Sequence, residues 1–217
     1  MVGDGAVPFT REQWHAALDE KMGRDLRVKC ARSRVAVCGL GGLGSNVAIA
    51  LARSGVGVLH LIDFDRVEIT NLNRQQYFVD QLGMPKAHAL AENLKRIAPY
   101  CDLVVEERRI VPEAIPSLFD GDDIVCECFD KPEAKSMLVD GVSSAYPDKP
   151  LIVGSGMAGL RSANEIATRR VGGRLYLCGD GVSGVEDGLG LAAPRVLACA
   201  AHEALMVLRL IAGEREA

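Results

Sequence analysis

The sequence lacks the patterns that would carry the chain into or across a membrane. Its first residues, MVGDGAVPFTREQW, contain no positively charged start followed by an apolar run, so we expect no signal peptide. The most apolar late stretch, residues 191–213, is interrupted by four charged or titratable side chains and is therefore a poor membrane span. We expect a cytoplasmic protein in which this stretch forms a buried or subunit-interface helix.

Cysteines at metal-binding spacing are also absent. The seven cysteines are odd in number and several lie inside apolar runs, which favours reduced thiols in the cytoplasm. No CxxC occurs in the chain, so we predict that it has no four-thiolate zinc site.

The chain has no excess of positive charge. Its formal net charge is −4, whereas nucleic-acid binding usually relies on a basic surface, so we do not expect a nucleic-acid partner. The 217 residues suit one domain, and neither an internal repeat nor a long linker divides them. We therefore predict a single domain over 1–217, made of an N-terminal helical segment (10–32), a nucleotide-binding core (34–159) and a C-terminal part with strands, a glycine-rich loop and a helix (160–217).

Strand-like and helix-like segments alternate through most of the chain. Apolar runs predict strands at 34–38, 56–63, 102–106, 122–129 and 150–156, and helical patterns predict helices at 42–54, 83–97 and 131–146. This alternation is typical of a doubly wound parallel sheet with helices on both faces. We predict a Rossmann-like α/β fold with a mainly parallel sheet. Short strands within 160–177, a glycine-rich loop at 178–190 and an apolar helix at 194–212 extend it at the C-terminus.

A glycine-rich loop follows the first predicted strand. Gly39, Gly41 and Gly44 satisfy the pattern G-x-G-x-x-G, and Gly42 adds a fourth glycine. Glycine permits a tight turn and lets a phosphate approach the backbone, while the following helix N-terminus attracts anions. Asp63 ends the next strand, where an acid can hold ribose hydroxyls. We predict nucleotide binding; the alternative is a tight turn that serves helix–sheet packing alone.

The glycine pattern does not separate a redox cofactor from ATP, but the residues after it do. A nicotinamide-dependent dehydrogenase or regulatory module is the weaker alternative, because the length leaves little room for a substrate domain. The segment 63–78, DFDRVEITNLNRQQYF, instead places polar side chains at the carboxyl edge of the predicted sheet. Within it Arg74 offers a planar fork for phosphate oxygens, and Lys86 begins a helix near the same edge. Two cations suit a reaction that expels pyrophosphate.

Asp130 follows the fourth predicted strand in the stretch CECFDKPEAK. A carboxylate at this edge can hold a Mg²⁺ ion that bridges phosphates. An Asp before a helix is also a common N-cap, so the residue alone has two interpretations. The presence of Arg74 and Lys86 favours the magnesium site.

Four segments together resemble the ThiF/MoeB/HesA family of the ubiquitin-activating-like superfamily: GLGGLG, DFDRVEITNLNRQQ, GMPKA and CECFDK. The resemblance covers about residues 34–159, and the length and tail are most similar to the short ThiF proteins. It implies an adenylyltransferase (a nucleotidyltransferase) that uses ATP and Mg²⁺. The implied substrate is the C-terminal glycine of a small ThiS-like sulfur carrier ending in Gly-Gly. Pyrophosphate is released, and the implied setting is thiamine biosynthesis by a homodimer.

The resemblance also implies residue roles. Arg74, Lys86 and Asp130 are the expected catalytic residues, with Asp130 as the magnesium ligand. The expected ATP-binding set is Gly39, Gly41, Gly42, Gly44, Asp63, Asp65, Asn71, Arg74, Gln75 and Lys86. No general base is expected, because the attacking carboxylate is already ionised.

The chain departs from the family at several positions. Lys131 stands where Asn is frequent, and Arg11 and Arg24 are weak candidates for an arginine given to the partner subunit's ATP site. Cys178 is a candidate for a covalent link with the carrier, although an ordinary structural thiol is the simpler interpretation. The nearest alternative of the same fold is a tRNA threonylcarbamoyladenosine dehydratase, against which the acidic balance argues.

Overall fold

The computed structural model describes residues 7–185 and 188–217 and contains one seven-stranded sheet of order β3-β2-β1-β4-β5-β7-β6. Neighbouring strands are parallel except β6 and β7, which form an antiparallel pair. This confirms the predicted mainly parallel, doubly wound sheet. The strands are β1 Arg34–Cys38, β2 Val58–Asp63, β3 Asp102–Glu107, β4 Ile124–Glu127, β5 Leu151–Gly154, β6 Ala167–Gly172 and β7 Leu175–Gly179.

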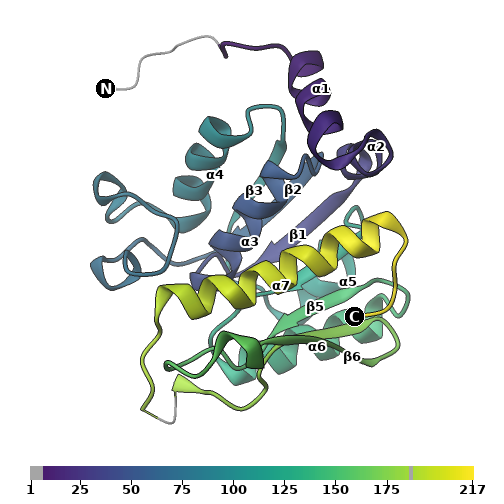
Figure 1. Ribbon diagram of the computed structural model, residues 1–217. Helices are drawn as coiled ribbons and strands as arrows, with labels where there is room; N and C mark the ends of the chain where they lie inside the picture. The colour runs from purple at the N-terminus through teal and green to yellow at the C-terminus, as the bar shows by residue number, and fades with distance from the viewer. Residues whose placement is uncertain (1–6, 186–187) are drawn as a thin grey trace.

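Helices cover both faces of the sheet (Figure 1). Successive residues of β1 enter opposite cores: Val35 and Val37 pack under α3, α4 and α7, whereas Ala36 and Cys38 pack under α5 and α6. Burial from two sides explains why the inner strands are continuously apolar. The helices are α1 Arg11–Met22, α2 Arg24–Arg32, α3 Gly42–Arg53, α4 Lys86–Ile97, α5 Ile115–Leu118, α6 Pro132–Ala145 and α7 Ala193–Ala212, with short 3-10 turns at Ile69–Asn71, Val79–Gln81, Pro112–Ala114 and Ala163–Glu165.

Two segments differ from the sequence prediction. The stretch 10–32 is two helices, because Gly23 adopts φ +84°, a left-handed conformation that ends α1 and redirects the chain. The connection from β3 to β4 contains the unpredicted helix α5, which is only four residues long and has a proline in its first turn.

The C-terminal strands belong to the main sheet. β7 lies parallel beside β5, and β6 folds back on β7 as the antiparallel edge. The predicted glycine-rich loop therefore begins inside β7, and its residues 186 and 187 lie outside the described residues. Within the described ranges, no helix, α7 included, is long and apolar enough to span a membrane.

The strand order reverses between β1 and β4. The chain runs from β1 outward to β2 and β3, then returns to place β4 on the other side of β1. The carboxyl ends of β1 and β4 lie side by side, with Cys38 paired to Glu127. Open α/β sheets bind ligands at such a switch point, so the fold brings the glycine loop and the turn containing Asp130 to one crevice.

Candidate active site

A cavity of about 670 Å³ opens at this switch point. Its wall combines the loop after β1, the segment between β2 and α4, the residues after β3 and the turn after β4. Every residue of the predicted site except Gly44 lines it. Segments far apart in the sequence, such as those of Gly39 and Val196, therefore share one cavity.

The loop after β1 is shaped by glycine. Gly39 has φ +86°, and a Cβ built on it would lie 2.8 Å from the Phe129 ring and 3.1 Å from the carbonyl oxygen of Cys128. Gly41 and Gly42 line the cavity as the N-cap and the first residue of α3. The free N–H groups of that helix start give the cavity an anion-binding end.

Gly44 does not line the cavity. It is buried in α3, and a Cβ on it would stand 1.8 Å from the carbonyl oxygen of Gly39. The prediction that Gly44 contacts the nucleotide is therefore corrected. Gly44 has a packing role, because its lack of a side chain lets α3 approach the loop that begins at Gly39.

Asp63 links the loop to the end of β2. One of its carboxylate oxygens accepts the Leu40 N–H at 2.6 Å and the other accepts the Asp65 N–H at 2.8 Å. Burial raises the pKa of Asp63, while these two hydrogen bonds and Lys86 act against the rise. Each oxygen keeps another lone pair, so ribose hydroxyls can donate to the same carboxylate.

Lys86 lies at the start of α4 and is almost buried. Its Nζ is 3.3 Å from Asp65 Oδ2, and its side chain is 8% exposed. Both Lys86 and the half-exposed Asp65 line the cavity, so this ion pair forms part of its wall.

Arg74, Asn71 and Gln75 come from the 3-10 turn and the residues after it. Arg74 donates through Nη1 to the carbonyl oxygen of Thr70 at 3.0 Å and to Asn73 Oδ1 at 2.8 Å. Among the described residues its Nε and Nη2 have no hydrogen-bond partner, and these atoms belong to a side chain that lines the cavity. Gln75 Oε1 is buried without a partner in the described part of the chain, a cost that a donor on a bound molecule would relieve.

Asp130 is exposed on the turn after β4 and does not cap α6. The N-cap position is Lys131, and the structure shows no side-chain cap there, so the capping interpretation is wrong. No hydrogen bond to the Asp130 carboxylate is found within residues 7–185 and 188–217. A free carboxylate at a phosphate-binding edge fits Mg²⁺, which takes one or two carboxylates together with phosphate oxygens and water. The described residues contain no group of three or more metal-ligating side chains, so the remaining ligands would come from the nucleotide.

Several cavity residues were not identified from the sequence. Arg109 stacks over the Phe64 ring, with its Cζ 3.9 Å from the ring centre, and Arg108 and Ile110 lie beside it. These residues directly follow the carboxyl ends of β2 and β3, so the rule that found Arg74 also applies to them. Val196 of α7 enters the wall without any signal in the sequence.

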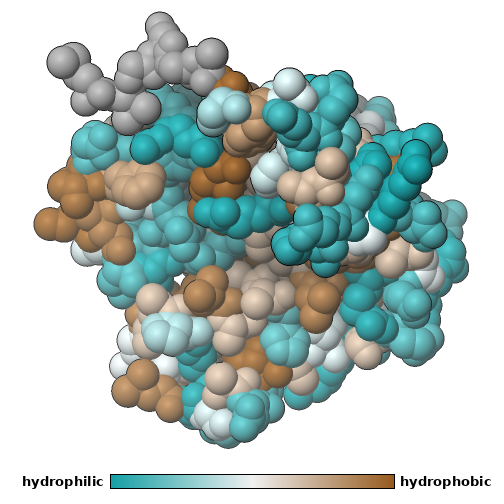
Figure 2. All heavy atoms as spheres, turned by 45° about the horizontal axis from the view of Figure 1, so that its top comes forward, coloured by the Kyte–Doolittle hydropathy of each residue, from teal (hydrophilic) through white to brown (hydrophobic). Residues whose placement is uncertain are grey.

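The segment between β2 and α4 also carries an apolar surface patch. Figure 2 shows apolar side chains gathered at the left of the molecule, where Figure 1 draws this segment. Its exposed apolar residues are Phe64, Ile69, Phe78, Val79 and Leu82. Contiguous apolar surface of this kind is typical of a contact with another molecule.

Three residues of uncertain role have clear positions. Cys178 is fully buried in β7, and burial raises the pKa of its thiol to about 12, as expected of a structural thiol. Arg11 stacks over the Tyr100 ring at 5.2 Å, and neither Arg11 nor Arg24 lines this chain's cavity. A contribution of either arginine to a partner subunit stays a prediction.

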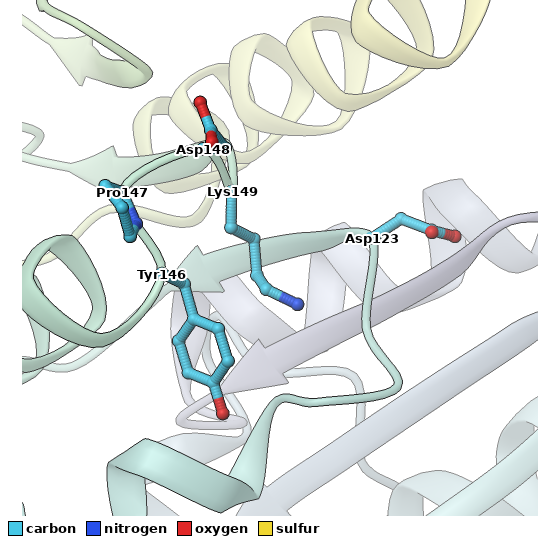
Figure 3. Close-up of a pocket in the computed structure, with 5 residues that line it drawn as sticks. All are labelled: Asp123, Tyr146, Pro147, Asp148 and Lys149. Atoms are coloured by element: carbon cyan, nitrogen blue, oxygen red, sulfur yellow. The ribbon is translucent and has the colours of Figure 1, made fainter.

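A smaller hollow of about 290 Å³ lies at the opposite, amino-terminal edge of β4 and β5 (Figure 3). Its lining residues are Asp123, Tyr146, Pro147, Asp148 and Lys149. The ammonium of Lys149 donates to the carbonyl oxygens of Phe119 and Asp122. The Lys149 ammonium therefore stabilises a backbone turn. Apart from Gly44, the predicted nucleotide-site residues line the larger cavity and not this hollow.

The geometry defines a doubly wound α/β protein whose cavity combines a glycine loop, a helix start, cations and a free carboxylate. The chain belongs to the ThiF family, because the model of that family, described as "ThiF family", matches residues 15–214.

Relatives and solved structures agree with this assignment. The chain is 33% identical over 188 residues to a molybdopterin-synthase adenylyltransferase of Salmonella typhimurium, covering 83% of this chain and 73% of that protein. It is 28% identical over 208 residues to an adenylyltransferase and sulfurtransferase uba4 of Aspergillus niger, covering 89% of this chain but only 42% of that protein. The crystal structure of the Escherichia coli tRNA N6-threonylcarbamoyladenosine dehydratase with ATP matches with a TM-score of 0.83 at 22% identity, over 95% of this chain and 98% of that one. This match establishes the shared fold.

The packing role of Gly44 gives a stability prediction. Gly44→Ala should lower the free energy of unfolding by about 2 to 3 kcal/mol, because the added methyl group collides with the Gly39 backbone. Gly190→Ala is the matched control, since nothing lies within 4 Å of a Cβ at Gly190. Urea unfolding of both variants measures the difference, and equal midpoints would show that the α3 contact is dispensable.

Proposed function

We propose that this chain is an ATP- and Mg²⁺-dependent adenylyltransferase that activates the C-terminal carboxylate of a small carrier protein and releases pyrophosphate. The observation that supports this most directly is the position of Arg74, Lys86 and Asp130. All three line one cavity with the glycine loop, although they come from three different segments. The adenylyltransferase relatives in the same family support the same reaction.

The chemistry needs positioning and charge more than proton transfer. The carrier carboxylate is already ionised, attacks the α-phosphorus of ATP, and forms an acyl-adenylate as the bond to the β-phosphate oxygen breaks. Arg74 presents two unsatisfied N–H directions to phosphate oxygens, and Lys86 adds a nearly buried point charge. Both cations stabilise the negative charge that builds on pyrophosphate. Magnesium held by Asp130 supplies further charge stabilisation when bound.

We propose a ThiS-type carrier ending in Gly-Gly, in thiamine thiazole biosynthesis in the cytoplasm. A Gly-Gly tail has no side chains, so its terminal carboxylate can approach the phosphate end of the cavity without steric conflict with lining residues such as Met157, Leu191 and Val196. We also propose a homodimer in solution. The apolar patch over residues 64–85 supports a protein partner at this face.

Carrier-dependent ATP–pyrophosphate exchange tests the function. Purified chain, ATP and Mg²⁺ should exchange labelled pyrophosphate into ATP when a Gly-Gly-ended carrier is added, and should fail with a carrier that lacks its last glycine. Exchange that depends on tRNA in place of the carrier would assign the dehydratase alternative. Absence of exchange together with binding of NAD(H) would assign a redox role.

Arg74→Ala should reduce carrier-dependent exchange by about 10²- to 10³-fold, because one preorganised donor to the phosphates is lost. The fold should persist, since the hydrogen bonds of this side chain serve two surface acceptors. Arg53→Ala is the control: Arg53 is exposed at the end of α3 and does not line the cavity, so its loss should leave exchange unchanged. Retained activity in Arg74→Ala would refute the phosphate role.

Asp130→Asn should raise the Mg²⁺ concentration for half-maximal exchange by about tenfold or more, because the free carboxylate ligand is removed. The exposed Asp140 of α6 offers the matched control Asp140→Asn, which should not change the titration. A magnesium titration of Asp130→Asn that superimposes on the wild type would remove Asp130 from the metal site.

A further inference from the structure

The turn that holds Asp130 begins at a buried acid, Glu127. This residue ends β4, is completely buried, and is not part of the cavity wall. Its Oε1 accepts the N–H of Phe129, two residues along the same turn, at 2.6 Å. The carboxylate thus fixes the backbone directly before Asp130.

A single lysine connects this carboxylate to two further elements. Lys135, on the second turn of α6, donates to Glu127 Oε2 at 2.8 Å and to the carbonyl oxygen of Gly154 at 2.7 Å. One ammonium therefore ties the ends of β4 and β5 to the helix that follows Asp130.

The other side of the turn packs on the phosphate loop. Cys128 N–H donates to the carbonyl oxygen of Cys38 at 2.9 Å, and the Phe129 ring lies where a side chain on Gly39 would be. The Glu127 carboxylate therefore sets the distance between the Asp130 backbone and the loop that receives the phosphates.

The charges around this pair are well defined. Burial raises the pKa of Glu203 on α7 to about 8, and this neighbouring acid accepts a hydrogen bond from the Cys128 thiol at 3.3 Å. Burial also raises the pKa of Glu127, whereas Lys135 and the Phe129 N–H act against the rise. Lys135 forms its direct ion pair with Glu127 at 2.8 Å, and Glu203 and Asp130 are the other acids near this pair.

Stability alone explains such a pair poorly. A buried ion pair often contributes no more than a well-packed apolar pair of the same volume, because both charges lose their hydration. Its geometry, in contrast, is specific: each carboxylate oxygen has a separate donor, one on the turn and one on α6.

We propose that Glu127 and Lys135 are positioning residues that hold the Asp130 turn at the phosphate loop in the geometry that magnesium-bound nucleotide requires. The inference rests on the proposed function and deepens it. Neither residue contacts the nucleotide; both act through the backbone of Phe129 and Asp130.

The test compares Glu127→Gln, Lys135→Arg and Asp130→Asn with the control Arg34→Met. The control breaks an ion pair of similar length, 2.7 Å, to the equally buried carboxylate of Asp122 at the opposite edge of the sheet. Four quantities are measured for each full-length variant. They are the Mg²⁺ concentration for half-maximal exchange, ATP affinity in EDTA, the hydrogen-exchange rate of the Phe129 amide without nucleotide, and the unfolding midpoint.

We expect Glu127→Gln to raise the Mg²⁺ requirement about tenfold while ATP affinity in EDTA changes by less than about twofold. The Phe129 amide should exchange faster in Glu127→Gln, whereas Lys135→Arg, which keeps the cation, should retain the wild-type magnesium dependence. Arg34→Met should lower the unfolding midpoint but leave the magnesium titration unchanged.

Each other outcome has a definite meaning. A shift in Asp130→Asn without one in Glu127→Gln overturns the positioning inference and leaves the proposed function standing. No shift in either variant removes the magnesium role itself. An equal shift in Arg34→Met reduces the effect to stability and overturns the inference. If Glu127→Gln does not fold, hydrogen exchange of the Phe129 amide in the wild-type protein tests the inference instead. Rapid exchange of this amide would show that its hydrogen bond to Glu127 is not formed, and would also overturn the positioning inference.

Discussion

The contact between Gly39 and the turn at Cys128 and Phe129 is the constraint on which the site depends. The two backbones are so close that a single methyl group at Gly39 would meet the Phe129 ring and a carbonyl oxygen. The parallel pairing of β1 with β4 produces this approach, and Gly44 allows α3 to follow it. The start of α3 and the turn that carries Asp130 are therefore held together by the sheet.

Much of this arrangement was predictable because it follows from local rules. Apolar runs and glycines located β1 and α3, and the strand-end rule located Arg74, Lys86 and Asp130 in the crevice. The fold class followed from the alternation of strands and helices. The family motif identified Asp63, but only the structure shows that its carboxylate also shapes the loop through the Leu40 N–H.

What escaped prediction depends on contacts between distant segments. Glu127 looks like an ordinary polar residue at a strand end, and its importance arises from Lys135 and Gly154, which tertiary packing brings to it. Val196 reaches the cavity because α7 crosses α3. Gly44 fitted the nucleotide pattern equally well as a contact or as a spacer, and its buried position in α3 decides between them. The sequence likewise left two interpretations of Cys178, a covalent link with the carrier or a structural thiol, and its complete burial favours the structural thiol.

The lack of a cluster of three or more metal-ligating side chains in the described part of the chain has a consequence for how Mg²⁺ would be bound. A cradle of three or more acids would trap free divalent ions between turnovers, whereas one acid at a phosphate edge retains them weakly. Under the proposed chemistry, the metal therefore arrives and departs with the triphosphate. Occupancy of the site then follows the concentration of the Mg·ATP complex, and the metal leaves with pyrophosphate.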